Sequence, residues 1–534
     1  MTAPPSQPAI PQNAWDRIPV PELGSWTPSK TVSVVIPAYD AAEELPLTLA
    51  ALGAQTYPAD LLDVVVVDDG NEPALEVPTS VGEVAIRALR VDAAEKVGFG
   101  AGQARARGAQ AATGELLLFL DADIVADPEH VEAHARWHHV IDYAATLGTR
   151  TFVDVGGISA EALASASAAG EGLGALVADR EQQDHDWIEE MLAETDELRE
   201  PRADLWRVGV GSSIGMTAAL YHACGGYPAF GVRGIEDVTF GYRLFTAGAV
   251  FVPDRAAHCW HQGERFLSDA ASKKAAQRTR RPYAANNLPY RAHRKPKPGR
   301  SYTVPTLVVE VPLDAASTAK PEALACVEAL LASDTADAAI GMTAPQGDPV
   351  RERLALWMAG QERVVVTDAA TWAKAHPLSP VRVSVPPATL VGPTTLSRLW
   401  AELEEYRVGA VRTPEGEPPL RAVATRALRR AERLATDPRE VDHLIATLFG
   451  EVERSAAELD LDGAGAPAPP GAGSHRDAEV AALEAQVEAL RARRAVRLAE
   501  AFGALRRARR PREIGGALRR IGRALGPNPR GPVA

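Results

Sequence analysis

Short runs of β-branched residues that alternate with helix-forming segments constrain the fold of this chain more than any other feature. The first run is Val32–Ile36 and the second is Val64–Val67. Between them, leucines recur at spacings of four and three, which predicts an amphipathic helix over residues 43–55. A strand, a helix and a strand in this order predict a βαβ unit whose parallel sheet is buried on both faces.

The same rhythm repeats further along the chain. It predicts strands over residues 84–89 and 116–120 with an alanine-rich helix over 102–112 between them. Acidic residues follow two of the expected strands: Asp68 and Asp69 end one, and Asp121-Ala122-Asp123 ends another. Ligand groups in such sheets collect at the carboxyl ends of the strands. The sequence therefore predicts a mostly parallel sheet with a polar site at that edge.

A second α/β rhythm begins after the first. Residues 306–311 predict a strand and residues 320–333 a helix, and Val364–Asp368 resembles Val64–Asp68. This pattern predicts a second, smaller α/β domain, without an acidic pair like that at Asp121 and Asp123. Two interpretations stay open, a degenerate duplication of the first domain and convergence on a common βα rhythm.

Together these patterns divide the chain into five parts. We expect a flexible N-terminal arm over 1–30, a main domain over 31–300, a second α/β domain over 301–455, a Pro/Gly-rich linker over 456–478 and a basic helical tail over 479–534.

Composition excludes several classes of protein. A net charge of −13 argues against a protein that binds nucleic acid along its length. Three separated cysteines provide neither a disulfide framework nor a CxxC zinc site, so we expect a cytoplasmic protein. From Arg491 onward there are 13 arginines and two acids. This tail suits an anionic membrane surface, which would place the protein peripherally on the inner face of the membrane, or it forms a solvated or coiled-coil helix.

The Asp121-Ala122-Asp123 segment is a candidate metal site. Carboxylates two residues apart on extended chain project to one face about 6–7 Å apart, which suits a hard divalent ion such as Mn²⁺ or Mg²⁺ and the diphosphate it would hold. The alternative is that a strand-end Asp caps the following turn. For Asp68 and Asp69 the alternatives are contact with a nucleobase or ribose and a turn-forming Asp-Asp-Gly-Asn.

Four blocks together resemble the inverting glycosyltransferases of family 2. They are VSVVIPAY at 32–39, VDDGN at 67–71, GFGAGQARARGAQAATGELLLFLDADI at 98–124 and GIEDVTFGYR at 234–243. The resemblance covers about half of the chain, residues 31 to 265. It implies a GT-A fold, a nucleotide-sugar donor with UDP the commonest, a divalent metal, and single-displacement transfer with inversion at the anomeric carbon.

The resemblance also implies roles for individual residues. Asp69 with Asp68 would contact the nucleobase, Arg105 would lie near the nucleotide, Asp123 would bind the metal and Asp121 would support metal and ribose. Three further residues would line the donor site: Pro37, Tyr39 and Ala122. Ala106 departs from the family pattern, which often has Asn after the Arg.

Glu236 and Asp237 open an expected helix over 236–247. Both are candidate catalytic residues, and by resemblance Asp237 is the base, because inverting transfer needs a carboxylate that removes the proton of the acceptor hydroxyl. Without the resemblance, both acids are residues commonly found at a helix N-terminus, where they interact favourably with the helix dipole. His261 fits the histidine that completes the metal shell in many relatives, and an imidazole ligand favours Mn²⁺. A structural histidine is the alternative.

The predicted function is metal-dependent transfer of a sugar from a nucleotide-sugar donor to the hydroxyl of a glycan, lipid-linked or small-molecule acceptor, in polysaccharide, cell-envelope or glycolipid assembly. The alternative is a catalytically weak GT-A scaffold that acts through its C-terminal domains, and a homo-oligomer is compatible with either. A dinucleotide-binding fingerprint is excluded because Gln103 stands where its last glycine is required. Nucleotidyl transfer is disfavoured because no glycine-rich loop follows the first strand.

Overall fold

The computed structural model describes residues 7–92, 94–263, 270–294, 300–313, 321–335, 337–405, 407–414 and 419–461. The described residues form one compact unit, which contains two sheets. The basic tail, and the expected linker from residue 462 onward, lie outside the described residues.

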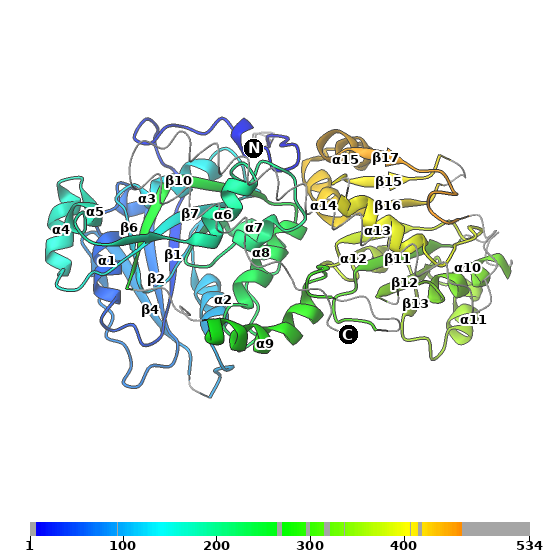
Figure 1. Cartoon of the computed structure of the whole chain (residues 1–534), viewed down its shortest axis with the longest axis horizontal. Helices are drawn as coiled ribbons and strands as arrows, with labels where there is room; N and C mark the ends of the chain where they lie inside the picture. The colour runs from blue at the N-terminus through cyan, green and yellow to red at the C-terminus, as the bar shows by residue number, and fades with distance from the viewer. Residues whose placement is uncertain are drawn as a thin grey trace, which may run out of the picture. The chain divides into compact units, whose positions relative to one another are not determined.

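The first sheet has ten strands among the described residues, in the order β3-β4-β2-β1-β5-β9-β7-β10-β6 with β8 paired to β7 (Figure 1). The strands are β1 Val32–Ala38, β2 Leu62–Asp68, β3 Ser80–Val81, β4 Val84–Arg90, β5 Leu116–Leu120, β6 Ile124–Ala126, β7 Ala144–Val153, β8 Gln182–Asp184, β9 Ser213–Thr217 and β10 Val250–Gln262.

The half of this sheet that was predicted from the β-branched runs is parallel. β4, β2, β1 and β5 pair in parallel, with Val34 opposite both Val64 and Leu118. Beyond β5 the sheet is mixed, because β9 is antiparallel to both β5 and β7. The predicted α/β fold class is confirmed, and the mostly parallel pairing holds for the half that carries the acidic strand ends.

Both faces of the parallel half are buried. Val35, Val65 and Val67 belong to one hydrophobic cluster, whereas the alternate residues of the same strands belong to another. Helix α2 crosses β1 and β2 closely at Gly108, where an added Cβ would lie 2.4 Å from a methyl group of Val35. The helices of this part are α1 Leu45–Leu52, α2 Ala101–Ala111, α3 His130–His138, α4 Ala160–Ala168, α5 Gly172–Leu176, α6 Asp186–Glu194, α7 Ala218–Ala223, α8 Glu236–Thr246 and α9 Ala270–Asn287, with 3-10 turns η1 Trp15–Arg17, η2 Ala59–Leu61 and η3 Leu205–Val208.

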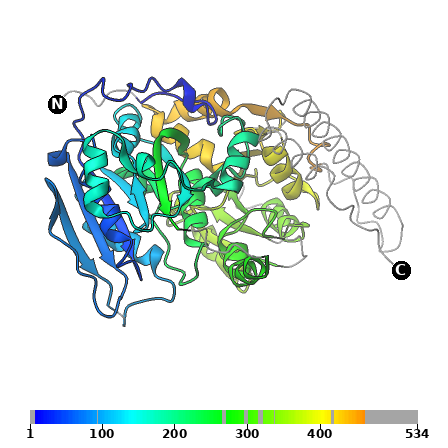
Figure 2. The same ribbon diagram turned by 60° about the vertical axis from the view of Figure 1, so that its left-hand side comes forward.

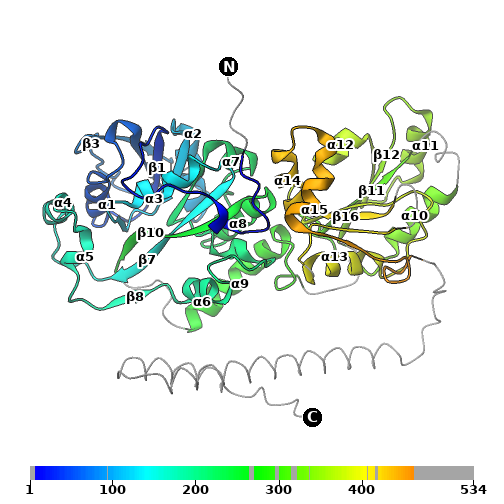
Figure 3. The ribbon, with the colours of Figure 1, turned by 90° about the horizontal axis from the view of Figure 1, so that it is seen from above.

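The second sheet confirms the predicted second α/β domain. Among the described residues it has seven strands in the order β13-β12-β11-β14-β16-β15-β17 and its own hydrophobic core. Figure 3 shows α14 and α15 side by side next to β16. Its elements are β11 Leu307–Pro312, α10 Pro321–Leu331, β12 Ala338–Thr343, α11 Pro349–Trp357, β13 Val364–Thr367, α12 Ala369–Lys374, β14 Val381–Ser384, α13 Thr395–Glu405, β15 Ala410–Arg412, β16 Arg421–Ala424, α14 Thr425–Leu434, η5 Pro438–Glu440, α15 Val441–Phe449 and β17 Glu451–Glu453.

The N-terminal stretch differs from the expected flexible arm over its described part. Ile10 and Ile18 are buried in a cluster with Trp137 and Val250. The Asn13 amide donates to two backbone carbonyls, and its own oxygen accepts from Phe251 N at 2.9 Å. Figure 2 shows this stretch, in dark blue, running to the orange α14–α15 segment. Scattered apolar residues between prolines gave no periodic signal for this packing.

Residues 456–461, assigned to the linker by prediction, also pack: Leu459 and Leu461 are buried in the second core. Across the described part of the chain, every helix is too short or too polar to cross a bilayer.

Candidate functional site

At the carboxyl edge of the first sheet, the buried side chain of Arg105 contacts two of the expected site residues, Asp121 and Asp237. Arg105 projects from α2, donates one bond to Asp121 Oδ1 at 2.5 Å and another to Asp237 Oδ1 at 3.0 Å. The side chain of Arg105 is only 4% exposed. Arg105, which the resemblance placed near the nucleotide, therefore connects the turn after β5 with the start of α8. It thus connects the expected metal site with the expected base.

Helix α8 begins at Glu236, as predicted, with both acids in its first turn. Burial raises the pKa of Asp237, while the Arg105 guanidinium opposes that rise. Burial and the neighbouring Asp237 raise the pKa of Glu236 to about 7. The two adjacent carboxyl groups thus differ: Asp237 is ion-paired to Arg105, whereas Glu236 Oε2 is buried without a hydrogen-bond partner in the described residues.

Asp123 and His261 lie together on the adjoining strands. Asp123 Oδ2 is 3.4 Å from His261 Nε2, because β6 pairs antiparallel with β10 and brings Ile124 opposite His261. Asp123 Oδ1 is shielded from water and has no hydrogen-bond partner among the described residues. An orphaned carboxylate oxygen beside an imidazole is a donor set that suits a divalent transition metal.

No group of three or more His, Cys, Asp or Glu side chains in the described part of the chain is placed to bind a metal ion. Asp121, expected as a third ligand, is instead engaged by Arg105. The protein therefore presents two candidate ligands for an ion, Asp123 and His261, and the carboxylate of Asp121 beside them.

The other acidic pair has two distinct environments. Asp68 accepts from the backbone and side chain of Asn71 and from Leu75 N, and these bonds outweigh burial and lower the pKa of Asp68. The turn-forming role therefore holds for Asp68. Asp69 is different: burial raises its pKa and its Oδ1 is buried without a partner in the described residues. Its free oxygen faces Gly100, where an added Cβ would lie 2.1 Å away.

The remaining predicted residues are placed as follows. Tyr39 is 60% exposed, with Lys96 Nζ 3.7 Å from its ring centroid. Pro37 lies in β1 opposite Val67. The side chain of Ala122 belongs to the hydrophobic core, and its carbonyl accepts from Thr48 Oγ1 at 2.7 Å. The side chain of Ala122 therefore points away from the polar edge, which differs from its expected place in the donor site.

Sequence reasoning missed three residues of this region. Lys96 donates to the carbonyl of Asp69 at 2.6 Å and lies 3.4 Å from its carboxylate. Arg150 and Phe152 lie two residues apart on β7, so their side chains are on the same face of the sheet as those of Cys259 and His261 in the paired strand β10. The Phe152 ring lies 4.6 Å from His261 between ring centroids. The alternation of side chains along β7 was the sequence signal that could have placed Arg150 and Phe152 on one face.

The fold and this edge define an α/β protein with a carboxylate-rich site where parallel strands end. The family model for "Glycosyl transferase family 2" matches residues 33–162, which include β1, β2, α2 and both acidic strand ends. The predicted resemblance to glycosyltransferase family 2 is therefore confirmed for this segment of the chain.

Curated relatives also match parts of this chain. The chain is 28% identical to chondroitin synthase of Escherichia coli over 254 residues, which are 46% of this chain and 37% of the relative. It is 36% identical to the amylovoran biosynthesis glycosyltransferase AmsB of Erwinia amylovora over 123 residues, 23% of this chain and 39% of the relative. The chain thus spans well under half the length of these relatives.

Two solved structures are reported for their likeness. The mannosyltransferase PcManGT of Pyrobaculum calidifontis, in complex with GDP-Man and Mn²⁺, has a TM-score of 0.30 and 17% identity, covering 52% of this chain and 66% of that one. S. aureus TarS 1–349 in complex with UDP-GlcNAc has a TM-score of 0.32 and 16% identity, covering 49% and 69%. At these TM-scores the likeness supports no assignment of function.

Proposed function

We propose that this chain transfers a sugar from a nucleotide-sugar donor to an acceptor hydroxyl with inversion at the anomeric carbon. The observation that carries the proposal is that Arg105, Asp121 and Asp123, which lie within the segment matched by the family model, converge with Asp237 at the carboxyl edge of the first sheet. These four residues come from the turn after β5, from α2 and from α8, and the fold alone does not require charged side chains there.

Asp237 is the proposed base. Its carboxylate would accept the proton of the acceptor hydroxyl while that oxygen attacks the anomeric carbon and the bond to the nucleoside diphosphate breaks. Arg105 holds Asp237 in place at 3.0 Å and favours its anionic form against the effect of burial. The buried guanidinium therefore opposes the rise in the pKa of Asp237 that burial causes.

Asp69 would hold the donor at its nucleobase. Its buried, unpartnered Oδ1 is an acceptor for an imide or amino N–H of a base. Lys96 and Tyr39 stand beside it, and the exposed Tyr39 ring offers a face on which a base can stack. We propose UDP as the nucleotide because it is the commonest donor in the family.

A divalent ion, Mn²⁺ or Mg²⁺, would be held by Asp123 and His261, with Asp121 close by. When bound, it would act as a Lewis acid that stabilises the charge on the departing diphosphate. The imidazole favours Mn²⁺ over Mg²⁺. The orphaned Asp123 Oδ1 supports this assignment, because a buried carboxylate oxygen without a donor is costly unless a cation meets it.

The acceptor class is proposed from the relatives. Chondroitin synthase and the amylovoran glycosyltransferase both carry names of polysaccharide assembly, so we propose a glycan acceptor. A peripheral location at a membrane through the basic tail stays a prediction, as does a homo-oligomer.

The reaction itself tests the proposal. The purified chain is incubated with UDP-sugars, GDP-mannose and a panel of oligosaccharide acceptors with Mn²⁺ or Mg²⁺, and nucleoside diphosphate release and product anomeric configuration are measured by NMR. We expect acceptor-dependent release of one nucleotide and a product of inverted configuration. A product of retained configuration would contradict the proposed role of Asp237, and binding of donor without turnover by any acceptor would favour the scaffold alternative.

A further inference from the structure

A recess away from the carboxylate site lies within the compact unit, lined by residues of α8, η3, α13, α14 and α15. Its empty volume, including its open mouth, is about 810 Å³. Aromatic side chains dominate the wall: Trp206, Tyr242, Phe245, Tyr290, Trp400 and Phe449. Tyr242 and Phe245 lie on α8, the helix that begins with Glu236 and Asp237.

One charged group in this wall stands out. Arg426, in the first turn of α14, lies with its guanidinium carbon 4.3 Å from the Phe245 ring centroid and 5.1 Å from that of Phe449. It donates no hydrogen bond and forms no ion pair with any of the described residues, and its Nε is buried. Burial lowers the pKa of Arg426, so its charge is held at a cost.

The arginine one turn further along the same helix shows the contrast. Arg430 is also buried, but its guanidinium donates to the carbonyls of Gly248 at 2.8 Å, Ala249 at 3.0 Å and Ile10 at 2.9 Å. Arg430 therefore has a structural role that explains its burial. No comparable set of acceptors among the described residues meets Arg426, and no acidic residue lies in the first turn of α14 to offset the charge.

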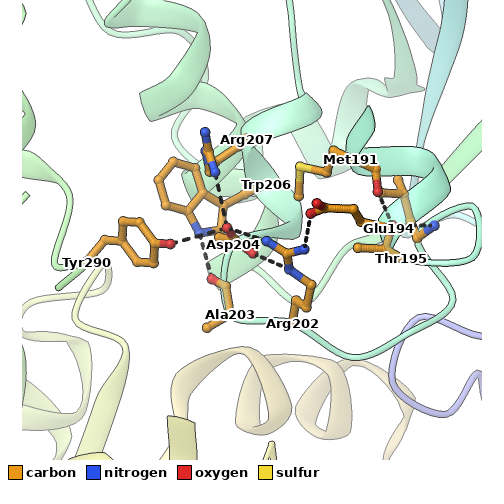
Figure 4. Close-up of polar contacts among 10 residues, drawn as sticks. Met191, Glu194, Thr195, Arg202, Ala203, Asp204, Trp206, Arg207 and Tyr290 are labelled. Carbon is orange, nitrogen blue, oxygen red and sulfur yellow. Dashed lines mark hydrogen bonds and ion pairs between the residues drawn. The ribbon is translucent and has the colours of Figure 1, made fainter. Parts of the chain in front are cut away.

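The other charges of the wall are largely paired within the protein. Figure 4 shows Arg202 facing Asp204 and Glu194, with bonds of 2.8 and 3.0 Å to Asp204. Asp204 also accepts from Tyr290 and Arg207. Glu404 pairs with Arg291 at 2.6 Å. The charge that the protein leaves unbalanced inside the recess is that of Arg426, with the exposed Arg407 at the rim adding to it.

We propose that this recess binds a monocarboxylate with a ring-shaped body, whose carboxylate meets Arg426 and whose ring packs among the aromatic side chains. A guanidinium presents a planar fork that matches a carboxylate. One unpaired cation balances one negative charge, and apolar walls favour an organic acid over a bare ion. Because Tyr242 and Phe245 are on α8, an occupant would contact the helix that carries Asp237.

Calorimetric titration of the full chain tests the proposal. Benzoate, 3-phenylpropionate and glucuronate serve as probes, the amides of the first two serve as neutral counterparts, and inorganic phosphate serves as a bare anion. The variants are Arg426→Met, Arg429→Met as a control for the same change on the outer side of α14, where Arg429 pairs with Glu432, and Asp237→Asn. Asp237→Asn separates this recess from the proposed donor site.

We expect wild type, Arg429→Met and Asp237→Asn to bind at least one carboxylate but neither amide, and Arg426→Met to bind it 10- to 100-fold more weakly, about the loss of one charged hydrogen bond. Tighter binding of glucuronate than of the other probes would place the ligand among sugar acids. Tighter binding of benzoate or 3-phenylpropionate would place it among aryl acids. Absence of binding to wild type, equal binding by Arg426→Met, or equal binding of phosphate would overturn the proposal.

Thermal unfolding without ligand provides a second arm. Replacing this half-buried cation by an apolar side chain of similar length removes a charge that no anion among the described residues offsets, while the new side chain can still pack against Phe245 and Phe449. We therefore expect Arg426→Met to unfold at the same temperature as wild type or higher. A clearly lower unfolding temperature would show that Arg426 has a structural partner and would overturn its assignment to a ligand.

Discussion

Replacement of Asp237 by Asn is expected to lower kcat for sugar transfer by about 10²- to 10⁴-fold, the usual contribution of a general base. Asn keeps the shape of the side chain but cannot accept the proton of an acceptor hydroxyl. Donor affinity is expected to persist, because the nucleobase contacts of Asp69 and the metal ligands Asp123 and His261 are unchanged. The measurement is kcat from initial rates together with donor affinity from calorimetry.

Asp60→Asn is the matched control, since Asp60 is exposed in η2, which precedes β2 at the end opposite Asp68 and Asp69. It is expected to leave kcat unchanged. Wild-type turnover by Asp237→Asn would show that another group removes the proton. A loss of donor affinity equal to the loss of kcat would instead give Asp237 a role in assembling the site through Arg105.

Acid is expected to destabilise this protein through a buried row of histidines on α3. His130, His134 and His138 recur every four residues on the helix face that packs against β7 and β9. Thr146 and Ser213 meet them, with His134 2.7 Å from Thr146 Oγ1 and 3.0 Å from Ser213 Oγ. Burial lowers the pKa of His130 to about 4 and of His138 to about 3, and that of His134 well below its usual value.

The direction of the pH effect on stability depends on whether the folded or the unfolded state binds more protons. Between pH 6.5 and about 4 the unfolded chain takes up protons on these histidines and the folded chain does not, so stability falls as the pH falls. Lowering the pH from 7 to 5 is expected to cost about 2 kcal/mol for each of His130 and His138. Stability from these groups is fully present above pH 6.5.

Urea unfolding at pH 7 and pH 5 measures this loss, with His138→Leu as the informative variant and His222→Leu as the control on the partly exposed α7. His138→Leu is expected to lose less stability than wild type on acidification, and His222→Leu as much. An unchanged acid sensitivity in His138→Leu would show that His138 is protonated in the folded protein at pH 5.

Local patterns predicted the parallel half of the first sheet closely. The β-branched runs predicted β1 and β2 and the apolar run 116–120 predicted β5, because a strand buried on both faces needs uninterrupted apolar residues. Leucine spacing predicted α1. The glycine-rich stretch over 208–215 contains the end of η3, a turn and the start of β9. Its glycines serve close packing: an added Cβ at Gly211 would lie 2.6 Å from both Arg105 Cζ and Asp237 Oδ1.

The candidate site was predictable where it follows strand ends and less so elsewhere. Asp69, Asp121 and Asp123 lie at the ends of predicted strands. Arg105 was placed near the nucleotide by resemblance, but its bond to Asp237 spans 132 positions and has no local signal. Lys96 was missed for the same reason, since it reaches Asp69 through tertiary packing.

The most direct test of the central claim is thermal stabilisation by nucleoside diphosphates and nucleotide sugars, with and without Mn²⁺, for wild type and Asp123→Ala. A ligand at 100 times its dissociation constant adds about 2.7 kcal/mol of stability, which gives a readily measured shift. The account predicts a shift for one nucleotide class that depends on Mn²⁺ in wild type and is lost in Asp123→Ala. A shift of equal size in Asp123→Ala, or none with any ligand in wild type, would contradict a metal-dependent donor site at Asp123.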